Sequence, residues 1–187
     1  IPRAWAATAR GPGVYLLDDL SDATAVRVVR QVQAVKQAGD VVVASIHWGG
    51  NWGYEVPTEH VRFAHRLVEG GVDLVHGHSS HHVKAIEVYR DRLVLYGCGD
   101  FIDDYEGISG YEAYRDDLRV MYLVHIEPGQ GRLEAAHLVP FQARRFRLHW
   151  ASAADARWLC ALLNRLGVRF GTRLQLQADR RMLLAWQ

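Results

Sequence analysis

The stretch "DVVVASIHW", residues 40–48, decides the fold class that the sequence predicts. It is a continuous run rich in β-branched residues, and it is too short and too rich in valine for a helix, so it predicts a strand. An apolar run without alternation is typical of a strand that is buried on both faces, as in a covered parallel sheet. This predicted strand ends at His47.

A helix and a second strand follow directly. Residues 57–71, "PTEHVRFAHRLVEGG", predict a helix with Thr58 as its cap and a glycine pair at its end. Residues 72–77, "VDLVHG", predict another short buried strand. Strand, helix and strand with short connections indicate a right-handed crossover between two parallel strands. The histidines that follow both strands are therefore expected at neighbouring carboxyl ends, where open α/β sheets bind their ligands.

The flanking regions complete an α/β prediction. Residues 1–20 carry prolines and glycines with little periodicity and indicate an irregular initial segment. Ser21 is a plausible N-cap for a helix that runs toward Gly39, because valines and alanines recur there at intervals of three and four residues. We expect this helix to have about 16 residues.

The second half is expected to be mostly antiparallel. Hairpin turns are predicted at Arg90–Asp91 and at residues 128–131, because turn residues there separate runs of strand-forming residues. Residues 152–167 predict a helix capped by Ser152, and residues 173–187 predict a closing hairpin. We treat residues 1–187 as a single domain.

Composition excludes several classes of protein. Lys and Arg total 22 against 21 Asp and Glu, so the net charge of +1 predicts neither nucleic acid nor an anionic membrane surface as a partner. No apolar segment approaches the ~20 residues of a membrane span. The two cysteines, Cys98 and Cys160, stand alone and predict buried thiols rather than a disulfide or a zinc site.

Histidine is the compositional anomaly, with ten residues, four of them between positions 76 and 82. Imidazole is a common metal ligand, and glycine beside it lets the backbone turn tightly next to an ion. We therefore expect His47, His78 and His81 to bind a metal. We expect His76 and His82 to orient these ligands or to contact substrate. The remaining five are expected to be surface or core residues: His60, His65, His125, His137 and His149.

Three motifs carry a resemblance to a known family. They are "SIHWGGNWGYEVP" (45–57), "AHRLVEGGVDLVHGHSSHH" (64–82) and "IEVYRDRLVLYGCGDFIDDYE" (86–106). In this order they resemble the capsule-synthesis protein CapA family, also called poly-gamma-glutamate biosynthesis proteins, over residues 40 to about 142. That family is similar to the calcineurin-like metallophosphoesterases. The resemblance implies a metallophosphatase-like mixed-sheet sandwich, flanked by helices, around a site for two divalent metal ions such as Mn, Fe or Zn.

The resemblance also assigns roles to residues. It implies that His47 and His78 ligate one metal and that His81 ligates the other. Glu87 matches a glutamate of the family, and Asp100 stands where the family has asparagine. With Trp48, whose ring follows His47, Glu87 and Asp100 are expected to contact the ligands or the substrate.

The early motifs of the family, which supply the carboxylate and amide side of the site, have no counterpart before His47. We therefore expect the chain to lack the amino-terminal part of the fold. A two-metal site needs a bridging oxygen ligand between ions ~3.5–4 Å apart, and imidazoles do not provide one. Asp103, Asp104 and Glu106 are nearby carboxylates that could replace it, although acidic loop residues are usually solvated.

Two further features allow two interpretations each. The rings of Trp52 and Tyr54, interleaved with glycines, either border the metal site or pack the loop itself. The basic run Arg144, Arg145 and Arg147 is either a solvated strand face or an anion-binding edge.

The function that the resemblance implies is biosynthesis or processing of a capsule polymer by a metal-dependent hydrolase. It implies an anionic polymer or a phosphorylated small molecule as substrate and the bacterial cell envelope or cytoplasm as location. One alternative is a non-catalytic scaffold or binding protein that keeps the fold without a complete two-metal site. A weaker alternative is a mononuclear zinc protein that uses only the three histidines and water. No residue is assigned a catalytic role.

Overall fold

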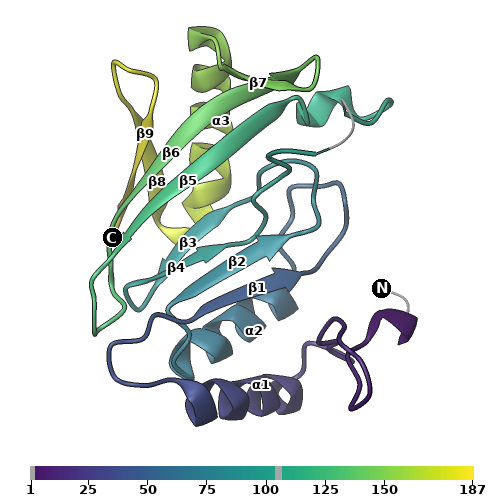
Figure 1. Ribbon diagram of the computed structural model, residues 1–187. Coiled ribbons are helices and arrows are strands. Elements are labelled where there is room, and N and C mark those ends of the chain that lie inside the picture. The colour runs from purple at the N-terminus through teal and green to yellow at the C-terminus, as the bar shows by residue number, and fades with distance from the viewer. Residues whose placement is uncertain (1–2, 104–106) are drawn as a thin grey trace.

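The computed structural model describes residues 3–103 and 107–187, which form an α/β sandwich of two sheets and their covering helices (Figure 1). The helices and strands have the following order: η1 (Arg3–Trp5), α1 (Asp22–Val35), β1 (Val43–His47), α2 (Thr58–Glu69), β2 (Leu74–His78), β3 (Ile86–Tyr89), β4 (Arg92–Leu95), η2 (Glu112–Tyr114), β5 (Leu118–Ile126), β6 (Leu133–Arg144), β7 (Arg147–Trp150), α3 (Ala153–Gly167), η3 (Val168–Phe170), β8 (Thr172–Leu176) and β9 (Met182–Trp186).

The first sheet has the order β1-β2-β4-β3, in which β1, β2 and β4 are parallel and β3 is antiparallel. The second has the order β5-β6-β9-β8, with β7 paired to β6, and is antiparallel in all these pairs. The predicted parallel pair and the antiparallel second half are thus confirmed. The hairpin between β3 and β4 turns at Arg90 and Asp91, whose φ angles of 49° and 61° suit the left-handed turn that matches strand twist.

Alternation along the strands divides the interior into two cores. In β4, Val94 faces α1 and α2 and packs with Phe63 and Val75, whereas Leu93 faces the second sheet and packs with Leu138. Helices α1 and α2 lie together beneath the first sheet, and α3 lies behind the second (Figure 1). The first sheet therefore lies between α1 and α2 on one side and the second sheet on the other.

Two local predictions were wrong. Strand β1 is not buried on both faces, because Val43 is 52% exposed and its residues alternate between exposed and half-buried. Within the described residues β2 is its ladder partner and its other edge is open, so β1 lacks the neighbour that would cover it. Helix α2 begins at Thr58 with Pro57 as N-cap, since proline's fixed φ suits a helix start and its missing N–H costs nothing there.

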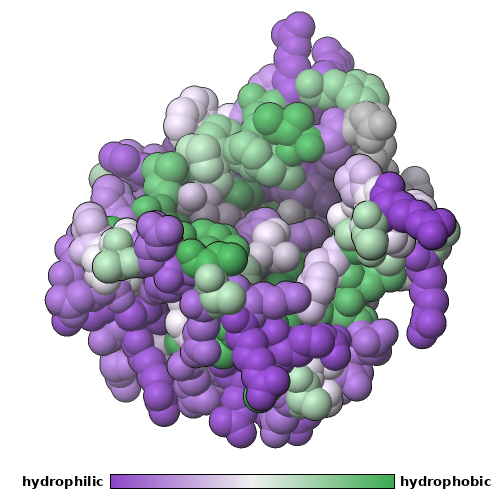
Figure 2. Space-filling model, turned by 60° about the horizontal axis from the view of Figure 1, so that its bottom comes forward, coloured by the Kyte–Doolittle hydropathy of each residue, from purple (hydrophilic) through white to green (hydrophobic). Residues whose placement is uncertain are grey.

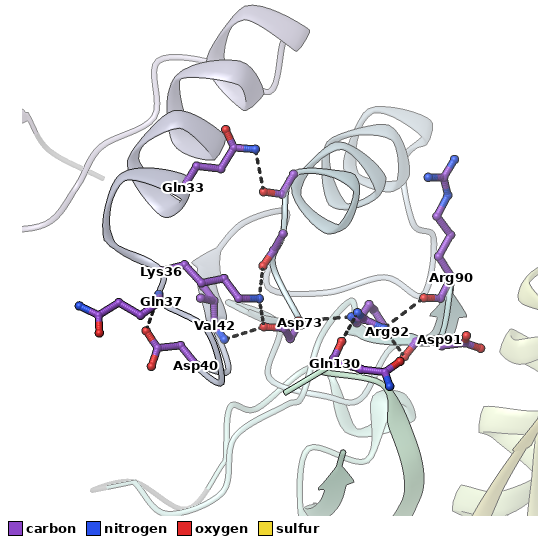
Figure 3. A network of polar contacts seen from close by, with 12 residues as sticks. Gln33, Lys36, Gln37, Asp40, Val42, Asp73, Arg90, Asp91, Arg92 and Gln130 are labelled. Atoms are coloured by element: carbon purple, nitrogen blue, oxygen red, sulfur yellow. Dashed lines mark hydrogen bonds and ion pairs between the residues drawn. The ribbon is translucent and has the colours of Figure 1, made fainter. Parts of the chain in front are cut away.

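Asp73 joins several elements at the amino ends of the parallel strands (Figure 3). Its buried carboxylate accepts hydrogen bonds from Lys36 Nζ at 2.5 Å, from the Val42 amide at 2.9 Å and from Arg92 Nε at 3.3 Å. Arg92 also donates to the carbonyl of Gln130, in the β5–β6 turn. One carboxylate therefore links the end of α1, the start of β1, strand β4 and the second sheet.

Candidate functional site

Histidines meet at the carboxyl ends of β1 and β2. The parallel register places His47 beside His78, and their ring centroids are 5.2 Å apart. His76 lies one step back on the same face of β2, 5.5 Å from the ring of His78, and its Nδ1 is 3.0 Å from Ser45 Oγ. Because residues in register on parallel strands share a face, this row of side chains follows from the pairing of β1 with β2.

The environment of His76 and His78 favours their neutral form. Burial lowers the pKa of His76. Burial also lowers the pKa of His78, and the neighbouring His76 and His47 lower it further. Neutral imidazole is the form that ligates metals, so these residues are prepared for that role at neutral pH.

His81 belongs to a different group of contacts, in the loop after β2. Its Nδ1 lies 2.9 Å from Asp100 Oδ2, which also accepts from Arg119 Nη1 at 3.2 Å. A carboxylate accepts only, so this bond assigns the proton to Nδ1 and the lone pair to Nε2 of His81. Carboxylates orient metal-binding histidines in this way, and the contact predicted for Asp100 is present as a bond to His81.

Arg119 was missed by the sequence analysis. Its side chain is 1% exposed and lies between Asp100 and Asp103, with Nη2 3.0 Å from Asp103 Oδ2. Asp103 is thus engaged by a cation, while Asp104 and Glu106 lie outside the described residues. The available signal was a single charge inside the otherwise apolar strand around residues 118–124.

Aromatic rings surround His82, the last histidine of the cluster. Its Nδ1 donates to the carbonyl of Val83 at 2.9 Å, and its buried Nε2 has no hydrogen-bond partner in the described part of the chain. Rings of Tyr54 and Tyr114 lie 4.7 Å and 4.8 Å from its own. Burial lowers the pKa of His82, so the structure keeps it neutral.

The loop after β1 is held by rings from elsewhere in the chain. Trp52 stacks on Tyr111 with centroids 4.2 Å apart, and Tyr54 contacts Tyr114. Trp52 also lies 5.3 Å from the ring of His81, so these rings both pack on residues 111–114 and border the histidine loop.

The side chains of Trp48 and Glu87 point away from the row of histidines, although the amide of Trp48 donates to the carbonyl of His78 at 3.0 Å. Trp48 is 7% exposed, stacks on His60 and donates its indole N–H to the carbonyl of Tyr96 at 3.0 Å. Glu87 accepts from the hydroxyl of Tyr96 and lies 3.0 Å from His65 Nε2, on the side of the sheet covered by α2. The contact expected between Glu87 and the predicted ligands is therefore not seen among the described residues, because its oxygens serve the sheet–helix interface.

A groove of about 710 Å³ runs along the open edge of β1 and reaches His47 and His78. Its other walls come from residues 14–20 and from α1. Seen from the side of α1 and α2, this face has a hollow bordered by hydrophobic residues (Figure 2). His81 is not among the residues that line the groove.

The donor set suits a divalent transition metal in its chemistry, since it offers neutral imidazoles and one histidine oriented by a carboxylate. Its geometry is incomplete: across residues 3–103 and 107–187, no three side chains of His, Cys, Asp or Glu are placed to hold one ion together. The structure brings His47 and His78 together and places His81 in the network with Asp100.

The profile of the family "Bacterial capsule synthesis protein PGA_cap" matches residues 1–105. The chain belongs to this family. The match includes residues 1–39, which the motif resemblance did not reach, and ends before β5. The two-sheet architecture agrees with the fold class that the resemblance implied.

Relatives in the family extend the comparison. The chain is 46% identical over 180 residues to a probable polyglutamine synthesis accessory protein of Mycobacterium tuberculosis, which covers 96% of this chain and 47% of that protein. It is 29% identical over 107 residues to the PGA biosynthesis protein CapA of Bacillus subtilis, covering 57% of this chain and 27% of that protein. The chain thus spans about half the length of the mycobacterial relative. None of the helices in the described residues is long and apolar enough to cross a membrane.

Proposed function

We propose that this chain contributes the histidine side of a metal-dependent hydrolase site that acts in the biosynthesis or processing of an anionic capsule polymer. One observation carries the proposal: the parallel register holds His47 and His78 side by side at the carboxyl edge of the first sheet. Two adjacent imidazoles at the strand ends of an α/β sheet form half of a metal-binding set. The choice of polymer is supported by the family, which is named for capsule synthesis, and by relatives named for PGA and polyglutamine synthesis.

Each residue has a defined task in this proposal. His47 and His78 would hold a divalent ion, and Asp100 fixes the ring of His81 so that Nε2 is its ligating nitrogen. Arg119 offsets the charge of Asp100 and of Asp103, which keeps both carboxylates in place. When bound, the metal would polarise a phosphoryl or amide oxygen of the substrate. An oxygen ligand from another part of the full protein would complete the set.

Calorimetric titration with MnCl₂ and ZnCl₂ tests the metal site. We expect binding at about pH 7.5 and weaker binding at about pH 5.5, because protons compete with the metal for the imidazole nitrogens. His78→Ala should lower the affinity at least tenfold, because it removes one of two adjacent ligands. His149→Ala, in exposed strand β7, is the matched control and should change nothing. Affinity that is equal in both variants, or equal at both pH values, would contradict histidine ligation.

A second candidate is a non-catalytic binding protein that keeps the fold. It is favoured by the incomplete donor set among the described residues. An activity assay on the full-length protein that contains this chain distinguishes the two candidates. The hydrolase requires metal-dependent cleavage of a chromogenic phosphodiester or shortening of poly-γ-glutamate, abolished by His78→Ala. Polymer binding without any turnover would support the second candidate instead.

A further inference from the structure

The hairpin of β6 and β7 concentrates positive charge and exposed rings in one short segment. Residues 143–150 read "ARRFRLHW". Arg144, Arg145 and Arg147 are all exposed, and Phe146 and Trp150 are 70% and 64% exposed. The site described above uses none of these side chains.

The three arginines are not neutralised within the described chain. No described carboxylate lies within ion-pair distance of Arg144, Arg145 or Arg147, whereas Arg115 and Arg119 each contact two carboxylates. The ladder also places Arg144 directly opposite Arg147. Like charges on facing residues repel each other, so this arrangement favours an anion between the two strands.

The turn itself is made of bulky residues. Arg145 and Phe146 have φ angles of 52° and 54°, in the left-handed region that two-residue hairpins normally fill with Asn and Gly. The β3–β4 hairpin uses the same left-handed turn at Arg90 and Asp91, because this turn matches the twist of the strands. Here the turn presents a guanidinium and an aromatic ring at the tip of the hairpin.

A chain of contacts joins the hairpin to the histidine loop. Trp150 stacks on Phe141 with centroids 4.9 Å apart, and Phe141 contacts Phe101 at 6.0 Å. Phe101 follows Asp100, the partner of His81. A ligand held by the hairpin would therefore lie on the part of the second sheet that is connected to the candidate site.

We propose that the tip of the β6–β7 hairpin binds a linear polycarboxylate, with Arg144, Arg145 and Arg147 pairing with successive carboxylates. Phe146 and Trp150 cover the methylene groups between them. A guanidinium forms bidentate hydrogen bonds with a carboxylate. A polymer with one carboxylate per unit places several carboxylates within reach of the three arginines. A nucleic acid fits less well, because the net charge is +1 and the hairpin presents its three arginines in one short segment rather than along a broad basic face. The choice of a glutamate polymer rests on the proposed function.

Binding of fluorescently labelled poly-γ-glutamate, followed by anisotropy at low salt with EDTA present, tests this inference. The variant Arg144→Gln/Arg145→Gln/Arg147→Gln should bind roughly tenfold more weakly, since three exposed ion pairs are lost. Its matched control is Arg30→Gln/Arg157→Gln/Arg173→Gln, which removes the same charge from exposed arginines elsewhere. The control should retain the affinity of the unmodified protein. Added salt should lower the affinity of the unmodified protein for the polymer far more than it lowers the affinity of the hairpin variant.

The inference is overturned if the unmodified protein does not bind the polymer, or if both triple variants lose the same affinity. It is also overturned if a single-stranded oligonucleotide or vesicles of anionic phospholipid bind more tightly than poly-γ-glutamate in the same assay. Failure of the metal site is separable, because the anisotropy assay contains EDTA and therefore measures polymer binding without a metal ion. The hairpin variant should conversely retain the metal affinity and the unfolding midpoint of the unmodified protein.

Discussion

At their amino ends, β1 and β2 lie beside Asp73, whose buried carboxylate is bonded to Lys36 and Arg92. At their carboxyl ends the same two strands carry His47 and His78, whose rings are neighbours and which form no ion pair with a carboxylate of the described residues. At the amino ends of these strands, charged side chains therefore pair with one another, whereas at the carboxyl ends the side chains include groups that can ligate a metal. Removing one partner of a buried charge pair is strongly destabilising, whereas an exposed imidazole such as that of His47 can be replaced with little effect on folding.

The largest expected effect comes from breaking the paired edge. Asp73→Ala removes the acceptor shared by Lys36, Arg92 and the amide of Val42, so it should lower the free energy of unfolding by about 3 kcal/mol. Urea denaturation measures the change. Asp179→Ala, which breaks an exposed pair with Arg181, is the control and should cost at most about 1 kcal/mol. An equal loss of unfolding free energy in the two variants would show that the buried pairing at Asp73 is no stronger than an exposed ion pair.

A smaller effect is expected in the network behind His81. Asp100→Asn keeps an oxygen acceptor for His81 Nδ1 but loses the charge that pairs with Arg119, which still has Asp103. We expect a loss of about 1–2 kcal/mol in unfolding free energy, the range for a hydrogen bond to a charged group. An unchanged or raised stability would mean that Asp103 alone satisfies Arg119.

The pH dependence of stability sharpens the comparison at the histidine edge. Burial lowers the pKa of His76, His78 and His82 below the ordinary 6.5, so the unfolded chain binds protons more readily than the folded one. Their contribution to stability is therefore present above pH 6.5 and is lost as the pH falls through and below that value. The midpoint of thermal unfolding should be lower at about pH 5.5 than at about pH 7.5, two values that bracket the ordinary pKa of histidine.

The variant His82→Gln should reduce that pH dependence, because it removes a buried group that must stay neutral. His149→Gln, at an exposed position, should preserve it. A higher stability at about pH 5.5 than at about pH 7.5 would contradict the lowered pKa of these histidines.

The smallest effect on stability is expected at His47. It is exposed at the end of an open-edged strand, so His47→Ala should change the unfolding free energy by no more than about 0.5 kcal/mol. The same variant should weaken the binding of Zn²⁺ in calorimetry, since it removes one of the two adjacent imidazoles. A large loss of stability would show that this edge is structural, like the edge at Asp73.

Much of the architecture was predictable because its causes are local. Short β-branched runs, three- and four-residue periodicity and turn residues predicted β1, α1, α3 and the Arg90–Asp91 hairpin. The crossover rule then placed His47 and His78 at one edge of a parallel pair, and the register confirms that placement. The metal itself stays a prediction.

The rest depended on which distant segments meet. The exposure of β1 was wrongly predicted, because burial of a strand depends on whether another strand or layer covers it and not on its own residues. Glu87 was expected at the site, but the β3–β4 pairing and α2 bring its oxygens to Tyr96 and His65.

The sequence by itself therefore determined the elements, their parallel or antiparallel sense and the edge at which the histidines gather, since periodicity and chain direction suffice for these. Only the tertiary structure decided that His81 is held by Asp100 and that Arg119 lies buried between Asp100 and Asp103. Arg119 lies on β5, in the second sheet, and Asp100 and His81 lie in loops that follow strands of the first. Such partners are chosen by the three-dimensional approach of the two sheets, where a buried charge requires a counter-charge, and no local pattern records that approach.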